Sequence, residues 1–277
     1  FTPAHSRCGV VCVDDEWGLR LAQESEVPVT TVSVFSHREA DWTVRRINFD
    51  RAIPAVTFDL VTPLGDERLI RMPMLGEVNV QNAVVALVAA LKLGCEFEAA
   101  VSALEGAEQI PGRMTSVNPD PGAQPLVIVD FAHTPEGLDW TLKSVRELTR
   151  GKLVLVFGTD GDRDATKREP LAEIAAQLAD VLWVTDENPR TEDAPSIRQQ
   201  LLNGIRRVRP DFHDVTEVTT CRRDAVRQAI LAADAGDIVV ISGKGVEWYQ
   251  DIQGIKHVYN DVPVAREVLE QDIRARL

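Results

Sequence analysis

The sequence predicts an α/β protein whose C-terminal part is a doubly wound, Rossmann-like and mostly parallel sheet. From residue 112 onward, short apolar runs alternate regularly with segments of helical periodicity. The runs are apolar at successive positions, as in strands that are buried on both faces of a sheet. Strict alternation of such strands with helices indicates a parallel sheet that is covered by helices on both sides.

Each element of residues 112–277 follows from its own apolar pattern. We expect strands at residues 126–131, 153–158, 181–186 and 237–243, a shorter strand near Val215, and a further ordered segment at 257–260. We expect helices at residues 135–149, 171–178, 196–208, 222–233 and 263–273. These elements together form one domain, residues 112–277.

Residues 1–111 have a different pattern. Strand-like runs at 27–35, 54–62 and 69–74 precede a helix at 79–93 and a short helix at 98–104. The Pro111–Gly112 pair marks a boundary. Because these elements leave no obvious whole core, we interpret residues 1–111 as the incomplete C-terminal part of another α/β domain.

The composition excludes several classes of protein. A formal net charge of -13 argues against nucleic acid as the main partner, since a duplex-binding surface needs a basic stripe. No apolar run is long enough to span a bilayer, and the first residues lack the pattern of a signal peptide. Cys8 and Cys12 bracket apolar residues, which favours small buried side chains over a metal site. A reducing cytoplasm is the expected setting.

Polar clusters follow four of the predicted strands. They are residues 132–135, 159–164, 187–190 and 244–247. In a doubly wound sheet, ligands bind beyond the carboxyl ends of the strands, so the four clusters predict one site at that edge.

Each cluster also has a purely structural interpretation. Asp130 and His133 can cap the following helix, although His133 can equally stack on a base or bind a phosphate. Arg163 lies in what could be a plain polar turn, yet a guanidinium there can pair with a carboxylate or a phosphate. The Asn188–Pro189–Arg190 segment is a rigid turn that could hold Arg190 ready as a carboxylate clamp. The Gly243–Lys244–Gly245 segment lacks the spacing of a nucleotide phosphate loop.

The clusters, in this order, resemble the Mur ligases, and among them the UDP-N-acetylmuramoyl-tripeptide synthetases. The matching stretches are GEVNVQNAVVAL (76–87), IPGRM (110–114), VDFAHTPEGL (129–138), FGTDGDRDATKREPLAEIA (157–175), ADVLWVTDENPRTEDAPSI (179–197), GDIVVISGKGVE (236–247) and VYNDVPVAREVL (258–269). VVCVDDEWGLRLA (10–22) is similar to the later part of that family's central ATPase domain.

The resemblance implies a reaction. ATP would phosphorylate the terminal carboxylate of UDP-MurNAc-L-Ala-D-Glu, and the α-amine of a diamino acid would attack the acyl phosphate, forming an amide of the cell-wall peptide. The product would carry the third residue of that peptide. The resemblance also implies a cytoplasmic monomer that works with ATP and Mg²⁺.

The resemblance assigns residues to two parts of the site. Those near the nucleotide would be Asn79, Asn82, Arg113, Asp130 and His133. Those that hold the amino acid would be Arg163, Glu187, Asn188, Pro189, Arg190, Gly243 and Glu247. Arg190 would grip the distal carboxylate of meso-diaminopimelate and Glu247 would meet its amine, which favours that diamino acid.

Three positions depart from the family's pattern. Glu187 stands where aspartate is usual, Asp160 where glycine is usual, and Val246 where histidine is usual. L-lysine or L-ornithine therefore stays open as the added residue. A folylpolyglutamate synthetase-like ligase and a non-catalytic binding module for an amino acid or nucleotide are the further alternatives.

Several parts of the family's machinery do not occur in this sequence. They are the G-T-N-G-K-T phosphate loop, the Mg²⁺-binding Glu and His, the carbamoylated lysine and the UDP-binding domain. We therefore expect the chain to be a fragment that holds neither the catalytic residues nor the metal ligands.

Such a fragment is predicted to have no ligase turnover by itself. The measurement is ADP release by the 277-residue chain with ATP, Mg²⁺, UDP-MurNAc-L-Ala-D-Glu and meso-diaminopimelate present. Amide product above the level of a protein-free control would contradict this expectation.

Overall fold

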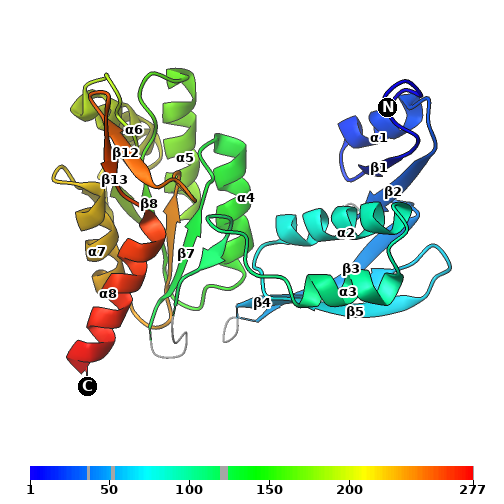
Figure 1. The fold of residues 1–277 in the computed structure, drawn as a ribbon. Coiled ribbons are helices and arrows are strands. Elements are labelled where there is room, and N and C mark those ends of the chain that lie inside the picture. Colours follow the sequence, from blue (N-terminus) through cyan, green and yellow to red (C-terminus); the bar gives the residue numbers. More distant parts are fainter. Residues whose placement is uncertain (36–37, 51–53, 119–123, 277) are drawn as a thin grey trace. The chain divides into compact units, whose positions relative to one another are not determined.

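The computed structural model describes residues 1–35, 38–50, 54–118 and 124–276, and it divides into two compact units, Phe1–Gln109 and Ile110–Leu277. Figure 1 labels the elements of both. Each unit has a sheet and a core of its own. No helix among the described residues is long and apolar enough to cross a membrane.

The first unit is built on a mixed five-stranded sheet. Its elements are β1 (Gly9–Cys12), α1 (Glu16–Glu24), β2 (Val29–Ser33), β3 (Trp42–Asp50), β4 (Ala55–Val61), β5 (Glu67–Met72), α2 (Glu77–Lys92) and α3 (Phe97–Glu105). The strand order is β1-β2-β3-β4-β5, with β1, β2 and β3 parallel and the remaining pairs antiparallel. Helices α2 and α3 contact each other and the sheet.

The first unit has an apolar core that was not obvious from the sequence. Side chains from β2, β3, β4, β5, α2 and α3 form one buried apolar cluster, which includes Val32, Phe58, Ile70 and Val84. No strand was predicted for residues 42–50, because that strand carries charged residues such as Arg45 and Asp50 beside its apolar ones. Without β3 the predicted strands could not form a continuous sheet.

The second unit is the doubly wound domain that the sequence predicts. Its elements are β6 (Thr115–Ser116), β7 (Leu126–Asp130), α4 (Pro135–Arg146), β8 (Leu153–Phe157), η1 (Ala165–Lys167), α5 (Arg168–Leu178), β9 (Val181–Val184), α6 (Ala194–Val208), β10 (Val215–Glu217), α7 (Arg222–Ala232), β11 (Ile238–Ser242), β12 (Tyr249–Ile252), β13 (Ile255–Val258) and α8 (Asp261–Arg276). The six-stranded sheet has the order β10-β9-β8-β11-β7-β6, and all of its pairs are parallel except β6 with β7.

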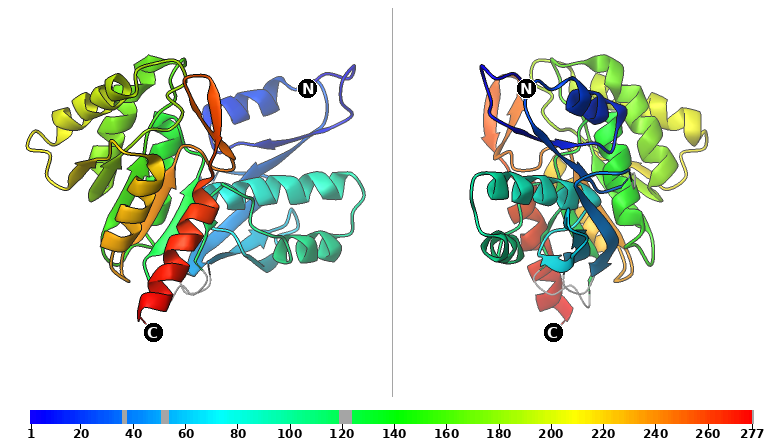
Figure 2. Two further views of the ribbon diagram at one scale, coloured as in Figure 1. Left: turned by 60° about the vertical axis from the view of Figure 1, so that its left-hand side comes forward. Right: turned by 90° about the vertical axis from the view of Figure 1, so that its right-hand side faces the viewer.

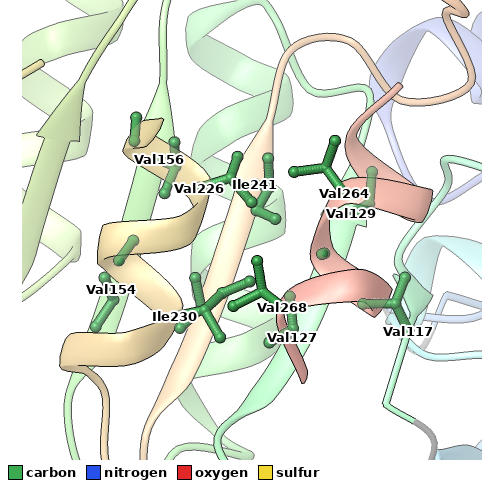
Figure 3. Packing of buried hydrophobic residues seen from close by; sticks show 14 of the residues in the cluster. Val117, Val127, Val129, Val154, Val156, Val226, Ile230, Ile241, Val264 and Val268 are labelled. Atoms are coloured by element: carbon green, nitrogen blue, oxygen red, sulfur yellow. The ribbon is translucent and has the colours of Figure 1, made fainter. Parts of the chain in front are cut away.

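Helices cover both faces of this sheet. Helices α4, α5 and α6 contact one another in sequence on one face, and α7 and α8 pack together on the other (Figure 2). Alternate residues of the strands point to the second face, where Val127, Val156 and Ile241 meet Val226 and Val268 (Figure 3). Burial of apolar side chains on both faces is the main force that holds these strands parallel.

Three local features differ from the sequence-based expectation. Residues 255–258 form an antiparallel hairpin with residues 249–252 that was not predicted, and the last helix begins at Asp261 instead of Pro263. Cys8 is exposed and Cys12 is half-buried, so the prediction of buried thiols is wrong. Cys8 precedes β1 rather than lying in it, and the thiol of Cys12 donates to Asp14 at 3.2 Å.

The packing predicts a large cost for removing an interior side chain. Ile241→Ala deletes a fully buried side chain of β11, and we expect it to lower the free energy of unfolding by about 2–5 kcal/mol. Ile255→Ala is the matched control, because Ile255 is 62% exposed in β13, and it should cost under about 1 kcal/mol. Urea unfolding followed by circular dichroism measures both variants. Equal losses would contradict the assigned core.

Candidate functional site

The topology of the second sheet brings three of the polar clusters into direct contact. Strands β7, β11, β8 and β9 lie side by side and parallel, so their carboxyl ends share one edge. At that edge the loop after β9 hydrogen-bonds both the loop after β8 and the loop after β11. Segments that are about 30 to 60 residues apart in the sequence therefore build one site.

Asn188 is the centre of this arrangement. Its buried amide nitrogen donates to Asp160 Oδ1 at 2.8 Å and to Glu247 Oε2 at 3.0 Å. Its amide oxygen accepts from Lys244 Nζ at 2.9 Å and from the backbone N–H of Asp251 at 3.1 Å. The Asn188 side chain thus holds three other side chains and one backbone N–H in place.

Arg190 is held in an unusual backbone conformation. Its φ is 53°, in the left-handed region that costs a non-glycine residue on the order of 1 kcal/mol or more. The hairpin stabilises it, because Arg190 N–H donates to Asp251 O at 2.9 Å and Gln253 N–H donates to Arg190 O at 2.6 Å. The Arg190 guanidinium lies against Asp160, with Nη2 to Oδ2 at 3.2 Å.

The same turn depends on a glycine in the loop after β8. Gly161 N–H donates to Asn188 O at 2.8 Å. A β-carbon at Gly161 would overlap the carbonyl of Pro189, which is itself buried. Only glycine permits this close approach of the two loops.

Glu187 is a buried carboxyl group without a full set of partners. It is 3% exposed, and its Oε2 accepts no hydrogen bond from the described residues. A β-carbon at Gly243 would lie 2.5 Å from that oxygen, so any other residue at this position would clash with the carboxyl group. Burial, together with the negative charge of Asp160, raises the pKa of Glu187 to about 8.

The pKa of Glu247 is shifted in the opposite direction. Partial burial would raise its pKa, but hydrogen bonds from Lys244 and Asn188 outweigh that effect and lower the pKa below its ordinary value. Lys244 is fully buried, and its Nζ lies 2.7 Å from Glu247 Oε2. A buried ammonium needs such a partner, because desolvation of an unpaired charge is costly.

Arg163 does not join this network among the described residues. It is exposed in the loop after β8, and the charge of its guanidinium helps to lower the pKa of Asp162, behind the hydrogen bonds that Thr191 donates to that carboxylate. Asp162 accepts from Thr191 N–H at 3.0 Å, which ties the loop to the residue after Arg190. Arg163 is thus at the rim of the site.

The residues predicted for the nucleotide divide between the two units. Arg113, Asp130 and His133 lie together: the Arg113 guanidinium is 4.4 Å from the centre of the Phe131 ring, and His133 Nδ1 is 2.8 Å from Phe131 O. Asp130 is mainly structural in this arrangement, because its carboxylate accepts from the backbone of Met114 and Ala132 and from Thr141.

Asn79 and Asn82 belong to the first unit, on helix α2. Asn79 is buried, and its Nδ2 donates to Leu75 O at 2.7 Å, which closes the turn before the helix. Asn82 is exposed. The structure therefore gives Asn79 a local role and leaves the side chain of Asn82 accessible.

Sequence reasoning missed Asp160, Lys244 and Asp251 as members of the site. Asp160 was noticed only as a departure from a family pattern, and Lys244 only as part of a poor phosphate loop. The available signal for Lys244 was a charged residue directly after an all-apolar strand, where burial forces it to find a partner. Asp251 gave no signal, since its hairpin was not predicted.

Buried polar atoms without a partner gather at this edge. Within the described part of the chain they include Thr159 Oγ1, Thr185 Oγ1, Glu187 Oε2, Arg190 Nε and Asp251 Oδ1. Buried polar groups in folded proteins are nearly always hydrogen-bonded, so such a group points to a site for polar ligand atoms or water.

Two family models match the chain. The model for the Mur ligase glutamate ligase domain matches residues 112–245, and the model for the Mur ligase middle domain matches residues 1–90. The chain belongs to the Mur ligase family.

Relatives of this Mur ligase chain carry consistent names. It is 37% identical over 271 residues to the UDP-N-acetylmuramoyl-L-alanyl-D-glutamate–2,6-diaminopimelate ligase of Streptomyces coelicolor, covering 98% of this chain and 53% of that protein. It is 40% identical over 275 residues to the UDP-N-acetylmuramyl-tripeptide synthetase of Leifsonia xyli, covering 98% of this chain and 52% of that protein. The chain thus spans about half the length of these relatives.

Solved structures agree with the fold. A UDP-N-acetylmuramoyl-L-alanyl-D-glutamate–2,6-diaminopimelate ligase superimposes with a TM-score of 0.64 and 33% identity, covering 96% of this chain and 54% of that one. A folylpolyglutamate synthase of Mycobacterium tuberculosis reaches a TM-score of 0.64 at 20% identity over 87% of this chain and 53% of that one, which shows a common fold alone.

The raised pKa of Glu187 predicts a pH-dependent stability. The pKa of this carboxyl group is about 8 in the folded state and near the ordinary 4.5 in the unfolded state. The folded state therefore binds the proton more tightly. The stabilisation is therefore complete below pH 4.5 and is lost as the pH rises through 8, by about 5 kcal/mol.

Glu187→Gln should remove this loss. Urea unfolding of the wild type and the variant from pH 4.5 to 8.5 measures the difference, and Glu267→Gln is the control, because Glu267 is exposed on α8. Parallel curves for the wild type and Glu187→Gln would contradict the buried, protonated state of this carboxyl group.

Proposed function

We propose that the protein adds meso-diaminopimelate to UDP-MurNAc-L-Ala-D-Glu in an ATP-dependent reaction, as the third residue of the cell-wall peptide. The observation that carries the proposal is the Asn188–Pro189–Arg190 turn, which presents a guanidinium to a partly buried polar site at the carboxyl edge of a parallel sheet. The names of the relatives, several of them diaminopimelate ligases, support the same substrate.

The amino acid would bind among the residues around Asn188. Arg190 offers the positive charge for a distal carboxylate, and Arg163 at the rim can add to it. Glu247 offers a carboxyl oxygen to an amino group, and the unpartnered Oε2 of buried Glu187 lies beside Gly243. The contribution of this part of the chain is to orient the nucleophilic amine and exclude water from it.

The residues near Arg113 fit a nucleotide. An exposed guanidinium, the half-buried ring of His133 and the Phe131 ring offer a positive charge and aromatic surfaces within one short stretch of backbone. ATP would supply the phosphoryl group that turns the substrate's carboxylate into an acyl phosphate, so that the attacking amine displaces phosphate. We propose that Asn79 and Asn82 also lie on the nucleotide side.

The Mg²⁺ that the reaction requires would be held outside these residues. No group of three or more His, Cys, Asp or Glu side chains suited to a metal ion occurs among those the structure describes. We therefore assign no step of the reaction to a metal ligand of this chain.

The two units would bind different substrates. We propose that residues 1–111 belong to the ATP-binding middle domain and residues 112–277 to the domain that binds the amino acid, in a cytoplasmic, monomeric enzyme. The family models and the separate cores of the two units support this division.

Replacement of Arg190 tests the proposal. In the full-length gene product that contains this chain, Arg190→Met should raise the KM for meso-diaminopimelate by about tenfold or more, because a charge-assisted contact to the distal carboxylate is lost. The KM for ATP should stay the same. ADP release with each substrate varied in turn measures both constants.

The matched control is Arg207→Met. Arg207 is 58% exposed on helix α6 and pairs with Glu169 and Glu173, away from the site. No activity with diaminopimelate, or an Arg190 variant with an unchanged KM for it, would overturn the proposed function.

A further inference from the structure

Asp160, which pairs with Arg190, is a residue of this site to which the proposed reaction assigns no role. Arg190 Nη2 lies 3.2 Å from Asp160 Oδ2, and the two side chains are 22% and 19% exposed. They are thus partly accessible while anchored in a mostly buried environment. A carboxylate here lies where a ligand's own carboxylate would have to approach Arg190.

The hydrogen bond between Arg190 and Asp160 is a weak one. Its single contact is longer than the 2.7–2.9 Å that is usual for a charge-assisted hydrogen bond. Arg190 Nε is buried and has no hydrogen-bond partner among the described residues. Of the guanidinium nitrogens, Nη2 alone is hydrogen-bonded to a described residue, so the group keeps a donor for a second carboxylate.

Asp160 also shares a hydrogen-bond donor with the carboxylate of Glu247. Asn188 Nδ2 donates to Asp160 Oδ1 at 2.8 Å and to Glu247 Oε2 at 3.0 Å, so one nitrogen bridges the two acidic groups. Lys244 balances Glu247 at 2.7 Å. Asp160 is balanced mainly by the single contact to Arg190, and a cationic ligand group could take over that role.

We propose that Asp160, beside Glu247, is a specificity-determining residue that accepts the distal ammonium of a diamino acid while Arg190 binds the carboxylate on the same carbon. The proposal rests on the proposed function. On binding, one weak internal ion pair is exchanged for two pairs with the ligand, and no charge is left without a partner. The site would thus recognise a complete zwitterionic end and not a lone carboxylate or a lone ammonium.

Three amino acids test the contact of Asp160 with the ammonium and the contact of Arg190 with the carboxylate separately. meso-Diaminopimelate has both groups at its distal end, L-lysine has the ammonium alone, and L-2-aminopimelate has the carboxylate alone. Each has the α-amine that the reaction uses. Their KM values in the full-length gene product, measured by ADP release, report the two contacts independently.

Asp160→Asn removes the charge of Asp160 and keeps an oxygen that can accept from Asn188. We expect the KM for diaminopimelate and for lysine to rise about tenfold or more. The KM for 2-aminopimelate should stay the same or fall, since Arg190 is released. Arg190→Met should give the reverse pattern, with lysine unaffected. Asp211→Asn, at an exposed position, is the control and should change none of the three.

The outcomes are distinct. Equal rises for all three amino acids with Asp160→Asn would assign Asp160 a structural role only and overturn the proposal, as would an unchanged KM for diaminopimelate. If the wild-type protein uses diaminopimelate and Asp160→Asn gives either of these two results, the proposed function still stands. Wild-type protein that uses none of the three would overturn both.

Discussion

The position of β11 is the constraint on which the candidate site depends. This strand comes last in the main sheet but lies between β7 and β8, paired in parallel with both. Its carboxyl end therefore delivers Lys244 and Glu247 beside the loop after β8. Had β11 joined the opposite edge of the sheet, next to β6, these side chains could not reach Asn188, and the polar segments would be four unrelated turns.

Buried charge explains why the loops at this edge are ordered. Lys244 is fully buried, and Asn188 and Glu247 are the partners of its ammonium. An ammonium without them would be strongly destabilising, so the loops after β9 and β11 must fold together. At the same end of the sheet, buried Arg222 pairs with Asp261 and donates to Ser242 O, which fixes β11 to the start of α8.

The sequence predicted the elements whose pattern is local. The mainly apolar strands β7, β8, β9 and β11 were predicted, and so was the start of α4, where the Thr134 side chain accepts from Gly137 N–H. Strand β3 and the β12–β13 hairpin were missed, because charged and exposed residues hide their periodicity. The roles of Asp160 and Lys244 could not be predicted either, since they depend on which strands are neighbours and not on local spacing.

The site also concentrates features that destabilise a fold. Arg190 has a positive φ, Glu187 is a buried carboxyl group with an unpartnered oxygen, and Arg190 Nε is buried without a partner among the described residues. Each costs on the order of 1–3 kcal/mol. The apolar packing on both faces of the sheet, around residues such as Val156 and Ile241, offsets them. Strain gathered at one edge of an otherwise regular sheet is what a ligand with complementary charges would relieve, and the regular core is what allows the protein to maintain it.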